Sequence, residues 1–158
     1  MAEGRRMMRL SRELAPEVFH SLLEEYKRFL REVLERMGGR DVVVDDDTCV
    51  AVFASARQAA LAAIDVQREV AAHEWPHERA VEMSIGLDSG EPGQVALRCA
   101  ELCDAAEGGQ IFLTEAVARL LDHEELGEHS VRDLGEVPLR RSDRSVRAYE
   151  LDNTSHFL

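Results

Sequence analysis

Two polar residue types are almost missing from this chain of 158 residues: Lys27 is its only lysine and Asn153 its only asparagine. Chemistry that needs a lysine ammonium or an asparagine amide must therefore use these positions or do without. Basic residues are also in the minority, with 19 lysines and arginines against 31 aspartates and glutamates, a formal net charge of −12. Nucleic acids and anionic membranes are bound through basic side chains, so we expect neither as a partner.

The sequence also lacks the features of an exported or membrane-spanning chain. No apolar run approaches the roughly 18 residues of a membrane helix, and the N-terminal residues contain no signal-peptide core. Its three cysteines, Cys49, Cys99 and Cys103, are too few and odd in number for a disulfide framework. We therefore expect a cytoplasmic location, with the cysteines used for packing rather than for a metal site.

Hydrophobic periodicity predicts alternating helices and strands. Apolar residues recur every three or four positions over residues 16–37, which is typical of a helix, and residues 41–53 form a hairpin signal around an acidic turn at 45–47. Further along, the pattern predicts helices over 56–73, 94–106 and 114–121, and strands over 81–87, 110–113, 130–133 and 146–151. This alternation predicts one α/β (α+β) domain over residues 1–158, with a core at about 10–151 and a tail at 152–158.

The order of short motifs adds a family resemblance. The motifs are GGR (38–40), AVF (51–53), WP (75–76), MSIGLDSGE (83–91), AAEGGQIFL (105–113), VRDLG (131–135) and RAYEL (147–151). This series resembles the class III adenylate/guanylate cyclase homology domain, in the form found beside actinobacterial regulators. The resemblance runs from about Leu10 to Leu151 and implies a ferredoxin-like, cyclase-type sheet with helices packed on it.

The resemblance also implies where a nucleotide site would lie. Such cyclases hold two Mg²⁺ or Mn²⁺ ions on two aspartates, select the base with a lysine and a partner residue, and stabilise the transition state with an asparagine and an arginine. By that pattern this chain keeps one metal aspartate, Asp47. It has Val43 at the lysine position, Gln94 at its partner, Leu97 at the asparagine position and Glu101 at the arginine position. These departures imply a degenerate domain.

A second departure concerns the first strand of the family, which carries the other metal aspartate and lies in the middle of the sheet. The sequence begins at about the helix that follows this strand, so two neighbouring strands would lack a partner. The sheet could close up, another segment could fill the place, or a partner's strand could do so; a natural start upstream of Met1 is a further alternative. Residues 5–10 are too basic for a buried strand.

The acidic turn and the arginine-rich loop could each bind an ion or could simply be exposed to solvent. Asp45 and Asp47 could share one Mg²⁺ or Mn²⁺ ion, with oxygens added by Asp88 and Glu91, but a solvated acidic turn is the interpretation that we favour, and we expect no cofactor. The arginines at 140, 141 and 144 either bind an anion or form a solvated loop.

The resemblance and its departures together predict a catalytically inactive, cyclase-like regulatory or protein-interaction module. We expect the chain to form a homodimer or to bind a protein partner, and we do not expect it to act as an enzyme. Two alternatives remain: a nucleotide-binding sensor without turnover, and the non-catalytic half of a heterodimeric nucleotidyl cyclase.

Overall fold

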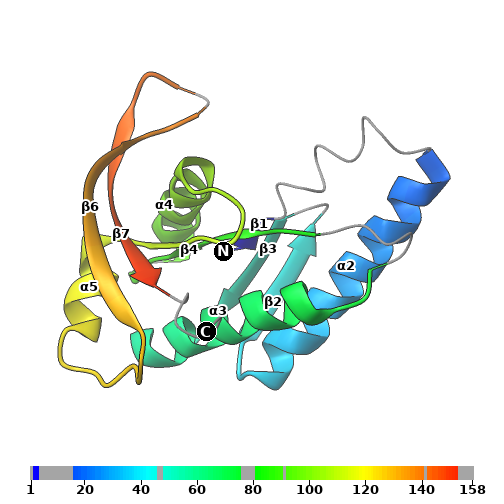
Figure 1. Ribbon diagram of the computed structural model, residues 1–158, viewed down its shortest axis with the longest axis horizontal. Helices are drawn as coiled ribbons and strands as arrows, with labels where there is room; N and C mark the ends of the chain where they lie inside the picture. Colours follow the sequence, from blue (N-terminus) through cyan, green and yellow to red (C-terminus); the bar gives the residue numbers. More distant parts are fainter. Residues whose placement is uncertain are drawn as a thin grey trace.

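The computed structural model describes residues 2–3, 16–45, 48–75, 81–90, 92–140 and 142–152. Its elements, in chain order, are β1 (Ala2–Glu3), α2 (Pro16–Arg36), β2 (Arg40–Asp45), β3 (Thr48–Val52), α3 (Ala56–Ala72), β4 (Ser84–Leu87), α4 (Pro92–Ala105), β5 (Ile111–Leu113), α5 (Glu115–Leu121), β6 (Ser130–Pro138) and β7 (Ser145–Asp152). Figure 1 shows them as one sheet with helices packed on it.

The described strands form a mixed sheet in the order β2-β3-β1-β4-β5-β7-β6. The β4–β5 pair is parallel, and the other neighbours are antiparallel. This arrangement confirms the expected α+β fold class, with helices packed on one mixed sheet.

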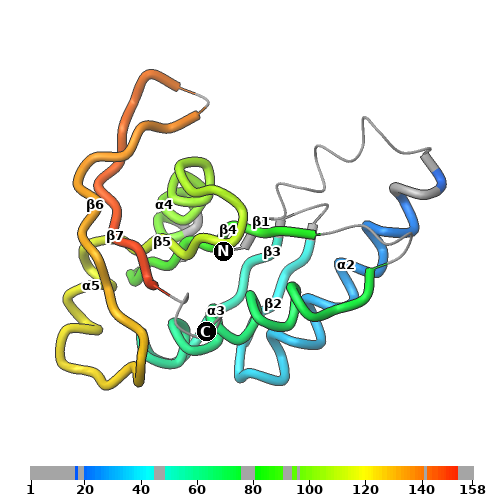
Figure 2. Tube along the Cα trace, viewed as in Figure 1, coloured from blue at the N-terminus to red at the C-terminus, as the bar shows by residue number. Residues whose placement is uncertain are grey.

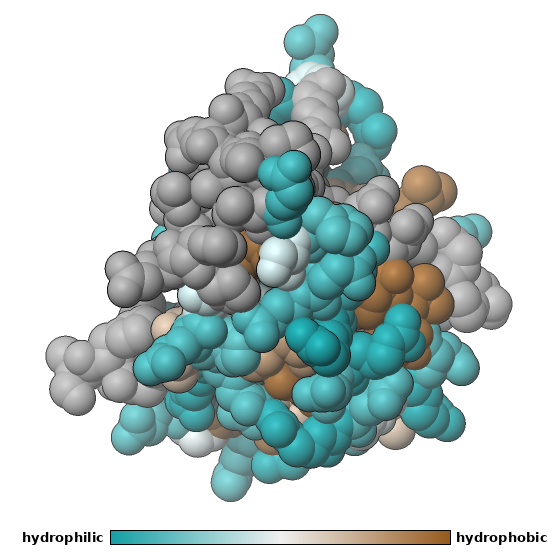
Figure 3. Space-filling model, turned by 90° about the vertical axis from the view of Figure 1, so that its right-hand side faces the viewer, coloured by the Kyte–Doolittle hydropathy of each residue, from teal (hydrophilic) through white to brown (hydrophobic). Residues whose placement is uncertain are grey.

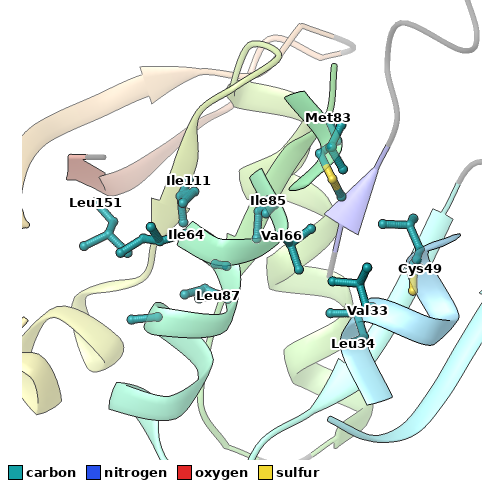
Figure 4. Close-up of a cluster of buried hydrophobic side chains, with 14 of the residues drawn as sticks. Val33, Leu34, Cys49, Ile64, Val66, Met83, Ile85, Leu87, Ile111 and Leu151 are labelled. Carbon is teal, nitrogen blue, oxygen red and sulfur yellow. The ribbon is translucent and has the colours of Figure 1, made fainter. Parts of the chain in front are cut away.

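Alternation along the strands divides the core between the two faces of the sheet. Ile111 and Leu113 of β5 belong to the larger cluster, which also contains buried residues of α2, α3 and α5 (Figure 4). Phe112, between them, belongs to a smaller cluster with Leu102 of α4 and Ala148 of β7. Successive side chains of a strand point to opposite faces, so α4 covers one face while α2, α3 and α5 cover the other.

The helix starts follow from local capping. The Ser55 side chain accepts a hydrogen bond from the Gln58 amide at 3.1 Å, and the Thr114 hydroxyl accepts one from the Val117 amide at 3.4 Å. Each cap satisfies one backbone donor that has no partner within its helix.

The middle of the sheet resolves the question of the first strand. Strand β1, only two residues long, lies between β3 and β4: Ala2 pairs with Cys49 on one side and with Ile85 on the other. Of the alternatives, another segment of the chain therefore fills the place, over two residues. Residues 5–10, the segment judged too basic for this role, lie outside the described residues.

The last two strands are longer than the sequence pattern indicates. Strand β6 extends to Pro138 rather than ending near residue 133, because a register irregularity between Asp133 and Gly135 interrupts its alternation. Gly135 has a φ of 68°, a conformation that glycine adopts without strain. The resulting β6–β7 hairpin curls past the end of the sheet towards α4 (Figure 2).

Candidate functional site

The face of the sheet that carries α4 is only partly covered. Helix α4 packs on β4, β5 and β7. Val42 and Val44 of β2 pack against the larger core cluster, whereas Val43 between them is 59% exposed. Val52 of β3 is 40% exposed. Apolar patches also interrupt the mostly hydrophilic surface on the side seen in Figure 3.

Three of the positions singled out in the sequence lie on one face of α4. Gln94, Leu97 and Glu101 are spaced by three and four residues, so their side chains follow one another along the helix. Gln94 is exposed and Leu97 is 70% exposed. Val95 of α4 and Val52 of β3 line the same cavity.

Gly86 of β4 sets how closely α4 approaches the sheet. A Cβ atom at this position would lie 2.7 Å from the Cys99 carbonyl oxygen and 3.0 Å from the Leu102 Cβ. The absence of a side chain at Gly86 therefore permits the close packing of helix on strand. Gly86 belongs to the motif at residues 83–91, but the sequence alone does not show that it contacts α4.

Glu101 has a structural role in this chain. Its Oε2 atom lies 3.0 Å from Nη2 of Arg144, which belongs to the connection between β6 and β7. In the same connection, the Arg140 amide donates to Asp104 Oδ2 at 3.1 Å and its guanidinium lies 3.2 Å from Glu107. Arg144 thus pairs with an acidic side chain of α4, and Arg140 pairs with one just beyond its end. The sequence predicted an anion site or a solvated loop, and neither alternative includes these ion pairs. Arg141 lies outside the described residues.

Asp88 is buried and bonded to neighbouring side chains at its own edge of the sheet. Its carboxylate, only 1% exposed, accepts hydrogen bonds from the Arg98 guanidinium and from the Thr114 hydroxyl, the latter at 2.7 Å. The sheet register places Glu3 opposite both Thr48 and Ser84, so β3 and β4 begin at the same edge of the sheet, the edge at which Asp45 ends β2. Asp88 follows the end of β4 at the opposite edge, so the expectation that it adds an oxygen ligand is wrong.

The remaining metal candidates are only partly within the described residues. Asp45 ends β2 opposite Thr48, whereas Asp47 and Glu91 lie outside the part that the structure describes. Within that part, no group of three or more histidine, cysteine, aspartate or glutamate side chains is arranged to hold a metal ion. Asp45 and Asp47 as metal ligands therefore stay a prediction.

All three cysteines are buried and none forms a disulfide bond. Burial raises the pKa of the Cys49 thiol to about 11, and burial also raises the pKa of the Cys99 thiol. A raised pKa keeps a thiol protonated and poorly nucleophilic at neutral pH. The cysteines therefore act as packing residues, as the sequence predicts. Among the described helices, none has the length and apolar character needed to cross a membrane.

Comparison with known proteins relates this arrangement to nucleotidyl cyclases. The guanylate cyclase domain of RhGC from Catenaria anguillulae, solved with GTP, superposes with a TM-score of 0.76 at 12% identity, over 96% of this chain and 92% of that one. The adenylyl cyclase CyaB from P. aeruginosa gives a TM-score of 0.68 at 19% identity, over 99% and 93%. A dimeric guanylyl cyclase domain of RhoGC from Blastocladiella emersonii gives 0.76 at 13%, over 95% and 92%.

By sequence, the chain is similar to uncharacterized mycobacterial proteins. It is 30% identical over 138 residues to Rv0891c of Mycobacterium tuberculosis and to Mb0915c of Mycobacterium bovis, covering 81% of this chain and 46% of each relative. It thus spans about half the length of these curated relatives. No protein-family model matches. The structural likenesses show that the chain has the fold of the adenylyl and guanylyl cyclase domains.

Proposed function

We propose that this chain is a catalytically inactive, cyclase-like module that associates with a second copy of itself through its open apolar surface. That surface consists of Val43 and Val52 on the sheet and Leu97 on α4, and we call it the α4-side surface. The observation that carries the proposal is the apolar composition of the α4-side surface. Val43 and Leu97 occupy the positions at which the family resemblance places the base-selecting lysine and the transition-state asparagine, and both are largely exposed.

The chemistry available at these positions supports inactivity. Phosphoryl transfer from a triphosphate depends on positively charged or hydrogen-bonding groups that stabilise developing negative charge. Val43 and Leu97 offer neither, and Glu101 contributes a negative charge that Arg144 compensates within the same chain. The only lysine, Lys27, lies in α2 on the opposite face of the sheet and cannot replace them.

The adjacent cavity gives the nucleotide-sensor alternative no support. Its wall near the α4-side surface is formed by apolar residues such as Val50, Val95 and Cys99. The arginine that lines the cavity, Arg57, already donates from Nε to the Glu125 carbonyl at 3.3 Å. A triphosphate would need several unengaged cationic or amide donors. Binding of GTP is a property of the Catenaria domain and does not transfer to these residues.

Apolar exposure supports association. Isolated apolar side chains are common at protein surfaces, but here two of them stand where the family resemblance places polar groups, and this replacement supports an interaction site. One of the structural neighbours is described as dimeric. A twofold dimer uses the same patch on both copies, so each apolar residue is buried twice. We further place the module in the cytoplasm, in keeping with its free cysteines.

The magnitude of this contribution can be estimated from exposure. Full burial of a leucine side chain is worth about 1.5–3 kcal/mol. Leu97 is 70% exposed, so its burial would contribute about 1–2 kcal/mol per copy, or about 2–4 kcal/mol in a symmetric dimer. This corresponds to a change in the dimer dissociation constant of about 30- to 1,000-fold.

Sedimentation equilibrium tests the proposal. We expect Leu97→Asp to weaken self-association at least about 30-fold, because it removes this contribution and adds a charge. Leu120→Asp is the matched control: Leu120 is 54% exposed on α5, on the opposite face of the sheet, and its substitution should leave the dissociation constant unchanged. A wild-type chain that stays monomeric at high micromolar concentration, or equal effects of the two substitutions, would contradict the proposal.

A further inference from the structure

The acidic side chains in the second half of α4 are paired with the connection between β6 and β7. Glu101 Oε2 lies 3.0 Å from Nη2 of Arg144. Asp104 Oδ2 accepts a hydrogen bond from the Arg140 amide at 3.1 Å, and Glu107, just beyond the helix, lies 3.2 Å from the Arg140 guanidinium. The connection therefore supplies positive charge and a backbone donor to the acidic end of this helix.

The backbone of this connection is held in place by contacts other than the ion pairs. The Leu139 amide donates to the Arg144 carbonyl at 2.9 Å, which ties the two sides of the hairpin together. The Leu139 side chain is buried and belongs to the smaller core cluster with Leu102 of α4. The Arg144 side chain, by contrast, is 72% exposed. It can therefore be replaced without the loss of a core contact.

Glu101 lies on the same face of α4 as the apolar surface. Leu97 and Glu101 are four residues apart, about one helical turn, so their side chains are neighbours. Gln94, at the start of the same row, is exposed and uncharged. With Arg144 paired to Glu101, this row has no net charge, although the formal net charge of the chain is −12. Because the centres of protein interfaces are depleted in charged residues, a neutral row suits contact with a second copy.

The Glu101 carboxylate depends on Arg144 for its compensation. Its Oε2 atom is buried and its side chain is 28% exposed, so water stabilises the negative charge only in part. Contact with a second copy would remove more of that water. A twofold dimer contains each residue twice, so loss of Arg144 would bring two uncompensated carboxylates into one interface. Removal of one partner of such a pair weakens association mainly because the other charge is left unpaired.

We propose that Arg144 controls self-association through the α4-side surface, because it neutralises Glu101 and so allows the α4 faces of two copies to meet. This inference rests on the proposed function, in which that surface binds a second copy of the chain. Arg144 acts here through Glu101, as a positioning residue that supplies the counter-charge. A second copy fits such a surface because each copy brings its own Arg144–Glu101 pair and adds no unpaired charge.

Sedimentation equilibrium on the full chain and its variants tests this inference. Arg144→Ala should weaken self-association at least about tenfold, which corresponds to about 1.4 kcal/mol. Glu101→Gln removes the charge but keeps the shape, and should leave the dissociation constant unchanged. The double variant Arg144→Ala/Glu101→Gln should associate like the unmodified chain, because no charge remains to be compensated. The matched control is Arg119→Ala, which breaks the 2.9 Å ion pair with Glu115 on α5 and should have no effect on association.

The outcomes separate this inference from the proposed function. If the unmodified chain associates and Leu97→Asp disrupts it, but Arg144→Ala has no effect, the inference is overturned and the proposed function stands. The same holds if the double variant is as weak as Arg144→Ala, since Arg144 would then act by some route other than the Glu101 charge. If the unmodified chain stays monomeric, both are overturned. Added sodium chloride should strengthen association of Arg144→Ala by screening the two carboxylates, and a weakening would contradict the inference.

Discussion

Replacement of Gly86 by alanine tests whether the close approach of α4 to β4 determines stability. The added Cβ would lie 2.7 Å from the Cys99 carbonyl oxygen and 3.0 Å from the Leu102 Cβ, and the first of these is a backbone atom that moves only with the helix. Overpacking of this kind costs about 1–3 kcal/mol. Without any clash, a glycine-to-alanine change stabilises by about 0.4–1 kcal/mol through the unfolded state. The net expectation is a destabilisation of about 1–2 kcal/mol.

Thermal unfolding followed by circular dichroism measures this change. For a chain of this size, 1 kcal/mol shifts the Tm by about 2–4 °C, so we expect Gly86→Ala to lower the Tm by about 2–8 °C. Gly86→Val, with a larger side chain at the same place, should lower it further. A Tm for Gly86→Ala equal to or above that of the unmodified chain would refute the reasoning, because the unfolded-state effect alone has the opposite sign.

Three other predictions concern buried groups and metal binding. Asp88→Ala removes a buried carboxylate that accepts hydrogen bonds from Arg98 and Thr114 at the end of β4. It should lower the free energy of unfolding by about 2–3 kcal/mol in urea titrations. The control Asp65→Ala, at an exposed position, should change it by less than about 0.5 kcal/mol. Burial raises the pKa of Cys49 from 9.0 to about 11, so the folded chain holds this proton more tightly than the unfolded chain. The Cys49 contribution to the free energy of unfolding should therefore be present below pH 9 and be lost between pH 9 and 11. Cys49→Ser should abolish this loss. An equal loss in the unmodified chain and in Cys49→Ser would show another cause. Millimolar Mg²⁺ or Mn²⁺ should leave the Tm unchanged, and a saturable rise that Asp45→Asn abolishes would instead establish a metal site.

The sequence predicts the helices and most strands because each has a local cause. Ser55 and Thr114 cap their helices, and the alternation of residues 41–53 specifies the hairpin. The length of β6 could not be predicted in this way, because the irregularity at Gly135 breaks the alternation on which the reading depends. The two residues of β1 carry no periodic signal, and their place in the middle of the sheet is fixed by pairing with β3 and β4.

The sequence predicts which residues of the candidate site share a helix face, but it does not predict which side chains they contact. The spacing of Gln94, Leu97 and Glu101 is enough to align them on one helix face, as the structure has them. The pairing of Glu101 with Arg144 joins segments 43 positions apart, and a sequence pattern without alignment contains no information on such a contact. The predicted contribution of Asp88 to a metal site was wrong for a similar reason, since it depended on the direction in which β4 runs.

The central claim is that the chain keeps the cyclase fold without the cyclase reaction. Incubation of the purified protein with ATP or GTP and Mn²⁺, followed by chromatographic detection of cyclic nucleotides, tests it most directly. We expect no cyclic AMP or cyclic GMP above a control without protein, because Val43, Leu97 and Glu101 supply none of the groups that the reaction needs. Protein-dependent formation of either product would contradict it.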